Sequence, residues 1–358
     1  MDSGTPKTLK DAIVYFTDVK VATEFLAKFR WPDGKPTCPK CGGQETSFLS
    51  TRLIWKCKAC KKQFSAKTGT VMEDSPIGLD KWLPAIWMIC GCKNGISSYE
   101  MARDLGVSQK SAWFMLHRIR LALKAGSFEK KLSGEVEADG TFVGGKLRLM
   151  NQKTRARKLA KGHLKGGGTV GKAIVTGLLE RNGEARVKVV AKRRRHQLMT
   201  HLRENVEPGS NVFTDELQSY RDAVVDYAHE VIDHTEAYVK GNVHTNGMEN
   251  FWSLFKRALK GTYVSVEPFH LQAYADEQCF RFNNRRDADG NPLGDADRFE
   301  KALAQLSGKR LTFVELIGRE PDSPMSWGHD SDAGSVGPNS VQFSELNRPY
   351  PWETNGGE

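Results

Sequence analysis

The sequence lacks any run of about 20 apolar residues, so it predicts no transmembrane helix. Its first twelve residues also lack the apolar core of a secretory signal peptide. Only seven cysteines occur in 358 residues, which does not suggest a dense disulfide framework. These absences argue against a membrane or exported protein, and we expect a cytoplasmic location in which thiols stay reduced.

Acidic residues are in the minority outside the C-terminal segment. The whole chain has a formal net charge of +10, but residues 320–358 contain seven acids and one base, so the rest of the chain carries +16. A net charge this positive indicates a polyanionic partner, and nucleic acid is the first candidate. We therefore also expect association with the nucleoid. A basic protein that is merely soluble is the alternative on charge alone.

Four cysteines form two CxxC pairs, which predict a zinc ribbon. Fifteen residues separate the second cysteine of the first pair from the first of the second pair, and that segment can form a hairpin that brings the pairs together. This spacing is typical of a site that binds one Zn²⁺ through four thiolates. Two redox motifs are the alternative. The predicted ligands are Cys38, Cys41, Cys57 and Cys60.

Residues 79–125 have the periodicity of helices, and their second half predicts a helix-turn-helix. Ser97 or Ser98 begins a short helix, Gly106 turns the chain, and Ser108 begins a longer helix. Gln109 and Lys110 would then lie where a recognition helix meets base edges. A plain helical hairpin is the alternative.

A basic insertion occupies residues 146–172, with nine lysines or arginines and no acid. Such a run is usually a solvated loop, but in a basic protein a mobile loop that contacts DNA is equally consistent. Residues 192–195 form a second basic cluster. With the two helix residues above, the predicted DNA contacts are Gln109, Lys110, Arg155, Arg157, Lys158, Lys161, Arg193 and Arg194.

From residue 134 onward the pattern predicts three strands, a helix, a strand, a helix, a strand and a final helix. This is the order of an α/β ribonuclease H-like domain with a mixed sheet. Asp139 lies within the first strand and Asp215 ends the fourth. The final helix, from about residue 245, has an apolar stripe of Met248, Phe251, Trp252, Phe255 and Leu259.

A second face of that helix carries Asn246, Glu249 and Lys256. Carboxylates from two adjacent strands and a packed helix can hold two divalent ions, and hard oxygen ligands suit Mg²⁺ or Mn²⁺. Such a pair activates a water or a 3′-hydroxyl against a phosphodiester. We therefore predict a metal site of Asp139, Asp215 and Glu249.

Four motifs in this order resemble the insertion-sequence DDE transposases of the 1595 type. They are the two-knuckle ribbon, LGVSQKSAWFMLHRIR, EADGTFVGGK, and FTDE followed by HTNGMENFWSLFKRALKGTY. The resemblance covers roughly residues 10–290. It implies a bacterial transposase that cuts the ends of its own element and joins them to target DNA, acting on double-stranded DNA as a homo-oligomer.

By motif, the resemblance makes Asp139, Asp215 and Glu249 the metal acids and places Lys256 on DNA near the reacting phosphate. Relatives vary between Asn and Glu at the third position, so Asn246 is an alternative ligand. We favour Glu249, because a carboxylate binds a cation more strongly than an amide. Two other functions stay open: a ribonuclease H-like nuclease without strand transfer, and a catalytically silent DNA-binding regulator.

The predicted organisation has six parts. They are an N-terminal helical segment (1–36), the zinc ribbon (37–70), the helix-turn-helix region (78–127), the catalytic domain (132–290), a C-terminal helical segment (291–318) and an acidic, disordered tail (319–358).

Overall fold

The computed structural model describes residues 6–124, 130–144, 151–160, 172–191, 194–215, 226–232, 245–287 and 289–318, without the side chains of residues 154, 157–159, 215, 231 and 232. The predicted tail lies outside these residues, as does the stretch after Asp215 where a short helix is predicted. Within the described ranges, none of the helices combines the length and apolar composition needed to cross a bilayer.

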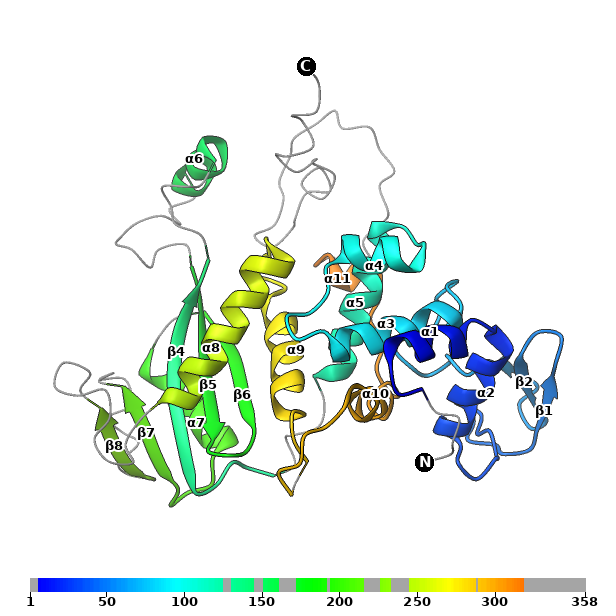
Figure 1. Cartoon of the computed structure of the whole chain (residues 1–358), viewed down its shortest axis with the longest axis horizontal. Coiled ribbons are helices and arrows are strands. Elements are labelled where there is room, and N and C mark those ends of the chain that lie inside the picture. Colours follow the sequence, from blue (N-terminus) through cyan, green and yellow to red (C-terminus); the bar gives the residue numbers. More distant parts are fainter. Residues whose placement is uncertain are drawn as a thin grey trace.

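The N-terminal part consists of helices with a small three-stranded sheet at its outer end (Figure 1). The strands β1, β2 and β3 are antiparallel, and β1 and β2 form the expected hairpin between the CxxC pairs. The bounds are α1 Leu9–Phe16, α2 Val19–Arg30, β1 Thr46–Leu49, β2 Ile54–Cys57, β3 Gln63–Phe64, α3 Leu79–Gly91, α4 Ser98–Leu105 and α5 Gln109–Leu123.

One hydrophobic core runs through this whole part. It joins residues of the first helices, the ribbon and α3 to α5 with Phe299 and Leu303 of the C-terminal helix α10 (Asp295–Leu303). The predicted segments 1–36, 37–70, 78–127 and 291–318 therefore pack around a shared core. The fully buried Trp82 and Trp87 of α3 lie within it.

The second part is a five-stranded mixed sheet in the order β6-β5-β4-β7-β8. Strands β4, β5 and β6 are antiparallel neighbours, whereas β7 and β8 run parallel to β4. The predicted hairpin at residues 181–183 joins β5 to β6, so the expected mixed α/β sheet is confirmed. The bounds are β4 Glu135–Val143, β5 Ala173–Glu180, β6 Ala185–Val190, β7 Asn211–Asp215 and β8 Ala228–Ile232.

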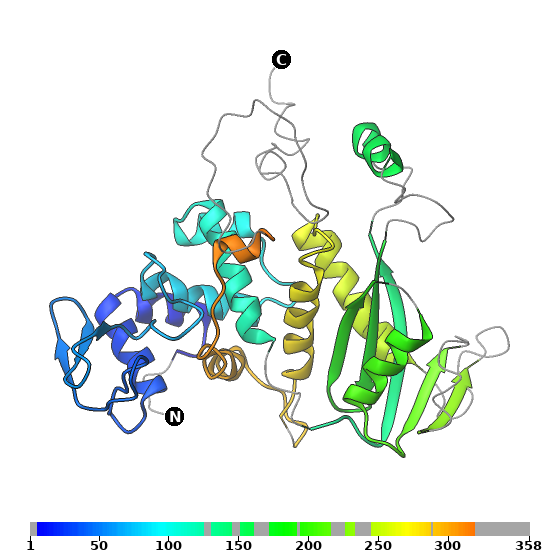
Figure 2. The same cartoon turned by 180° about the vertical axis from the view of Figure 1, so that it is seen from behind.

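Helices cover both faces of this sheet. The helix α8 crosses one face in Figure 1, and Figure 2 shows α7 on the opposite face. Separate apolar cores lie on the two sides, one with Met248 and Phe251 of α8, the other with Leu198 and Leu202 of α7. The bounds are α7 Arg195–Asn205, α8 Asn246–Ala258, the π-helix η3 Leu259–Tyr263 and α9 Leu271–Asn283.

The basic insertion differs from the predicted loop, because it contains the helix α6 (Gln152–Ala160). In both views α6 stands away from the sheet, and each of its described side chains is exposed. The α6 sequence QKTRARKLA contains a single β-branched residue, Thr154, and most of its other residues favour a helix.

A buried ionic cluster joins the two parts of the molecule. Glu277 of α9 accepts a 2.7 Å hydrogen bond from Arg120 Nε of α5 and is also bonded to Arg281 and Tyr263. Burial raises the pKa of Glu277, but Arg281 and Arg120 outweigh it and hold the pKa below its usual value. The carboxylate therefore stays charged and links the N-terminal helices to the sheet domain.

Candidate active site and zinc site

The strand order places two of the predicted acids side by side. Strand β4 pairs in parallel with β7, and the register ends with Ala138 opposite Thr214. The next residue on β4 is Asp139, and the next on β7 is Asp215. The backbone therefore brings these two positions together from points 76 residues apart in the sequence.

Alternation along β4 directs its acidic residues toward α8. Val136 and Ala138 belong to the core under α7, so Glu137 and Asp139 point to the opposite face. The contacts agree with this, because Asp139 bonds to a side chain of α8 and Glu137 to its backbone. The sequence EVEAD thus builds one apolar and one acidic face on a single strand.

Asp139 is held by two donors. Its Oδ1 accepts a 2.6 Å hydrogen bond from the backbone N–H of Gly140, and its Oδ2 accepts a 2.9 Å bond from Trp252 Nε1. Both donors are uncharged. The carboxylate is therefore oriented without being neutralised by them, which suits a metal ligand.

The first turn of α8 is capped from β4. Thr245, at the N-cap position, makes no capping bond with its side chain. Instead, Glu137 Oε2 accepts a 2.9 Å hydrogen bond from the backbone N–H of Met248. A carboxylate at this end also complements the helix dipole. Glu137 therefore fixes the start of the helix that carries Glu249.

Gly247 and Arg181 complete this cap. A side chain at Gly247 would place its Cβ 2.8 Å from Glu137 Oε2 and 2.5 Å from Leu179 Cδ2, so a larger residue would displace one of these side chains. Arg181 Nε lies 3.3 Å from Glu137 Oε1 and pairs with Glu135 at 3.1 Å. The buried Glu137 is thereby paired as well as hydrogen-bonded.

The remaining predicted residues lie along α8. Asn246 and Glu249 are exposed in its first turn, and Lys256 is half-buried in its last turn. Glu249, Trp252 and Lys256 follow one another at steps of three and four, so they share one side of the helix. The whole predicted apolar stripe, Met248, Phe251, Trp252, Phe255 and Leu259, is buried.

The structure thus brings Asp139 together with α8, and the backbone of Asp215 together with that of Asp139. Two features of this centre are not apparent from the acid motif alone: the capping role of Glu137 and the hydrogen bond from Trp252. The alternation of EVEAD is the signal that places Glu137 on the same face as Asp139. The apolar stripe predicts the burial of Trp252 but not the partner of its N–H.

The four predicted zinc ligands form a compact cluster. One ligand atom from each of Cys38, Cys41, Cys57 and Cys60 lies within 4.8 Å of the others. Backbone N–H groups, that of Cys60 first, lower the pKa of the Cys57 thiol to about 7. A thiol with this pKa is substantially ionised at neutral pH, as a metal ligand must be. The donor set and its spacing fit a tetrahedral Zn²⁺ site.

Comparison with known proteins finds two domain families in this chain. The transposase zinc-ribbon domain matches residues 20–63, and the ISXO2-like transposase domain matches residues 131–283. A transposase-like protein of Haemophilus influenzae is 34% identical over 88 residues, which cover 24% of this chain and 71% of that protein. This chain belongs to the 1595-type family of insertion-sequence transposases.

A longer match extends over about two thirds of the chain. A protein in the transposable element ISH50 of Halobacterium salinarum is 29% identical over 255 residues, which cover 68% of this chain and 84% of that protein. The predictions of a transposase, an insertion-sequence family and a zinc ribbon are thereby confirmed.

Two of the predicted DNA contacts of this transposase are engaged within the protein. Gln109 Nε2 donates a 2.8 Å hydrogen bond to Ser98 Oγ, tying α5 to α4. Lys110 Nζ lies 4.9 Å from the ring centroid of Phe313, in the short helix α11 (Phe313–Leu316). Farther along α5, Arg118 Nε donates a 3.0 Å hydrogen bond to Leu311 O. The C-terminal segment therefore lies along one side of α5.

The other predicted DNA contacts are described only in part. Arg155 is exposed on α6, and Arg194 is exposed just before α7. The side chains of Arg157 and Lys158 lie outside what the structure describes, and so do Lys161 and Arg193 altogether. Lysines on the surface of the ribbon, such as Lys58, Lys61 and Lys62, add exposed positive charge at the other end of the molecule.

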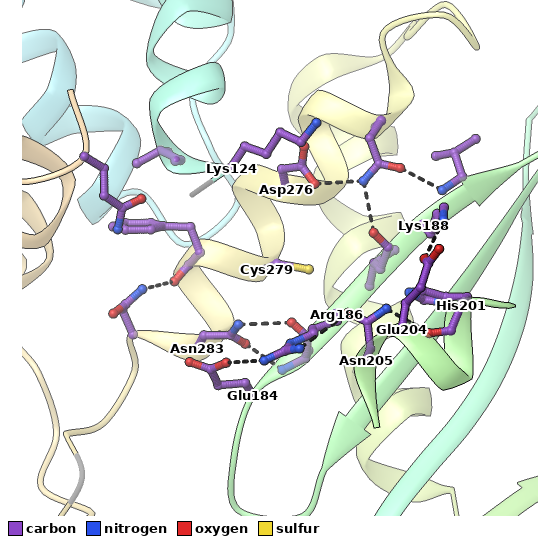
Figure 3. Close-up of a pocket in the computed structure, with 18 of the residues that line it drawn as sticks. Lys124, Glu184, Arg186, Lys188, His201, Glu204, Asn205, Asp276, Cys279 and Asn283 are labelled. Atoms are coloured by element: carbon purple, nitrogen blue, oxygen red, sulfur yellow. Dashed lines mark hydrogen bonds and ion pairs between the residues drawn. The ribbon is translucent and has the colours of Figure 1, made fainter. Parts of the chain in front are cut away.

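A cavity of about 760 Å³ lies apart from the acids, between β6, α7 and α9 (Figure 3). Its lining includes neither Asp139 nor Glu249. Asn283 bonds to both backbone groups of Ala185 on β6, at 2.8 and 3.0 Å, and Gln272 accepts from Val189 N at 2.7 Å. These amides satisfy the open edge of the sheet, so α9 protects β6 from pairing with another strand.

Proposed function

We propose that this protein is a DNA transposase that binds the ends of its insertion sequence and catalyses metal-dependent strand cleavage and transfer to target DNA. One observation carries the proposal: parallel pairing of β4 and β7 brings Asp139 beside Asp215, under the helix that bears Glu249. The strand order, with two parallel strands beside an antiparallel meander, supports a ribonuclease H-like fold for this domain.

Asp139, Asp215 and Glu249 would hold the divalent ions. The donor set fits them, since Asp139 is oriented by uncharged donors and Glu249 is exposed. When bound, two Mg²⁺ ions would activate the attacking oxygen and stabilise the leaving oxygen. Asn246 lies one turn before Glu249 and is the alternative third ligand. Glu249 is preferred because its charge binds Mg²⁺ more strongly.

Lys256 would position the substrate. It lies on the same side of α8 as Glu249, nearly two turns later, and its half-burial restricts the ammonium group. A lysine there can hold a phosphate next to the reacting one as a point charge. Its role is therefore orientation of DNA, and its removal would slow the reaction less than loss of a carboxylate.

DNA binding would involve several basic surfaces. We assign α4 and α5 as a helix-turn-helix, the zinc ribbon as an accessory DNA-binding module, and the insertion with Arg155, Arg157, Lys158 and Lys161 as a backbone contact. Arg193 and Arg194 extend that surface. Action on two element ends and a target implies a homo-oligomer on DNA.

The contribution of the insertion is measurable as a salt dependence. Each phosphate neutralised adds roughly 0.9 to the slope of log affinity against log salt concentration. Deletion of residues 150–168 should lower this slope by several such steps in a titration of duplex DNA. The matched control keeps the full length of the insertion and replaces its Lys and Arg residues by Gln. An unchanged slope in both variants would make the insertion a solvated surface.

The reaction itself is tested with duplex DNA that carries the inverted repeat flanking the gene. Wild-type protein with Mg²⁺ should cut at the repeat and join the new 3′ end to a target plasmid. Cleavage without joining would favour the nuclease alternative. Binding without cleavage, in Mg²⁺ or Mn²⁺, would favour the DNA-binding regulator.

A further inference from the structure

We infer that Trp252 is a positioning residue of the catalytic centre: its indole N–H holds the Asp139 carboxylate in the orientation that receives the metal. The inference rests on the proposed function, because it concerns the same metal site. It goes beyond that proposal by assigning a role in metal binding to a residue whose sequence pattern indicates only a core position.

The hydrogen bond connects two elements that carry the predicted ligands. Trp252 Nε1 lies 2.9 Å from Asp139 Oδ2, and the Trp252 side chain is 4% exposed. Most buried polar groups are hydrogen-bonded, and water reaches an indole N–H at this depth poorly. Asp139 supplies the acceptor, so breaking the bond would leave a buried donor unsatisfied.

The indole ring packs closely over the backbone of Gly177. Gly177 is the cross-strand partner of Asp139 on β5. A Cβ atom added there would lie 2.3 Å from Met248 Cε, 2.8 Å from Trp252 Cζ2 and 3.0 Å from Trp252 Cη2. The absence of a side chain at this position of β5 thus leaves the space that the Met248 side chain and the indole ring occupy.

The packing around the ring leaves it little freedom. Phe251 and Phe255 contact Trp252 at centroid distances of 5.2 and 6.5 Å, and Met248 belongs to the same core. A ring fixed in this way presents its N–H in one direction. That rigidity distinguishes it from a flexible polar side chain at the same place and makes it suitable for orienting a ligand.

The helix therefore connects two ligands of one site. Glu249 lies one turn before Trp252 on α8, so the helix that offers one carboxylate also orients the carboxylate of β4. A shift of α8 would disturb both ligands together. Residues that hydrogen-bond to metal ligands typically change metal affinity by roughly 10- to 100-fold when they are removed.

The test is direct Mn²⁺ binding by full-length, zinc-loaded protein, with free Mn²⁺ measured by electron paramagnetic resonance. Trp252→Phe keeps an aromatic ring and removes the N–H, so its Mn²⁺ affinity should fall by roughly 10- to 100-fold. Phe282→Leu is the matched packing control, since Phe282 of α9 is buried in the same core without a polar atom. It should retain wild-type Mn²⁺ affinity.

Cleavage assays supply a second readout. In Trp252→Phe the Mg²⁺ concentration for half-maximal cleavage should rise, and saturating Mg²⁺ should restore most of the rate. A residue with only a packing role would lower the rate equally at every Mg²⁺ concentration. Gly177→Ala, which pushes the ring without removing its N–H, should weaken Mn²⁺ binding too, and the double variant should bind no more weakly than Trp252→Phe.

Asp139→Asn separates this inference from the proposed function. If Asp139→Asn loses Mn²⁺ binding while Trp252→Phe and Gly177→Ala bind like wild type, the role of Trp252 is refuted and the metal site stands. If Asp139→Asn binds Mn²⁺ like wild type, the proposed metal site fails, and the inference fails with it.

Discussion

The zinc ribbon and the proposed acidic centre both consist of side chains suited to metal binding, but they are assembled in opposite ways. The four cysteines come from two short turns joined by one hairpin, within 23 residues of sequence. The acids come from β4, β7 and α8, and their proximity depends on the order of strands in the sheet. A local site can be recognised from spacing, whereas a distributed site depends on the whole fold.

Removal of zinc should have the largest effect, and it should fall on the local site. Structural zinc commonly contributes about 10–16 kcal/mol to the folding of small zinc-binding segments. Metal analysis should find about one zinc per chain. Chelation should unfold the ribbon and disturb the core it shares with α2 and α3, as limited proteolysis would report. A ribbon that resists proteolysis equally with and without zinc would contradict this account.

Trp252→Ala should disrupt the acidic centre by destabilising the sheet domain that holds it. The ring is buried between β5 and α8, so its loss should lower the free energy of unfolding by roughly 3–5 kcal/mol. Chemical denaturation of the zinc-loaded protein measures this effect. Zinc content should stay unchanged, because the ribbon has its own ligands and packs into a core separate from that of Trp252. A loss of zinc in this variant would show that the two sites are not independent.

Acid should weaken the two regions for different reasons. Burial first, then the nearby Lys188 and Arg186, lowers the pKa of His201 on α7 to about 3. An unfolded histidine titrates near 6.5, so the unfolded state binds the proton first and stability falls as pH drops below about 6.5. This single group should remove about 2 kcal/mol between pH 7 and pH 5.

The variant His201→Leu isolates that contribution. Its free energy of unfolding should change less between pH 7 and pH 5 than that of the wild type, when both are followed by chemical denaturation. In the ribbon, by contrast, acid releases zinc by protonating thiolates. Equal pH dependence in the two proteins would mean that His201 is accessible to protons in the folded state.

The sequence predicts much of both sites, for different reasons. The CxxC spacing alone indicates the four-cysteine cluster, because each pair lies on one turn. The strands around Asp139 and Asp215, the hairpin at residues 181–183 and the buried stripe of α8 follow from periodicity. Asp139 and Asp215 lie side by side because β4 and β7 pair in parallel. The periodicity of each strand does not show this pairing, and only the order of strands and helices along the chain indicates it.

Other features arise only when distant segments meet. Glu137 caps α8 because β4 passes beneath the first turn of that helix, 111 residues later in the chain. The packing of residues 309–316 along α5 likewise joins segments that no local pattern connects. The helix α6 was predicted as a loop because its basic run has no apolar stripe, so the amphipathic signal of a packed helix is missing.

The most direct test of the central claim compares Glu249→Gln with Asn246→Ala in one assay of strand cleavage, with DNA binding measured on the same preparations. Gln keeps the size of Glu and removes its charge, so DNA binding should persist while cleavage falls below detection. Asn246→Ala should stay active. Full activity in Glu249→Gln would contradict the assignment of Glu249, and loss of cleavage in Asn246→Ala alone would make Asn246 the third ligand.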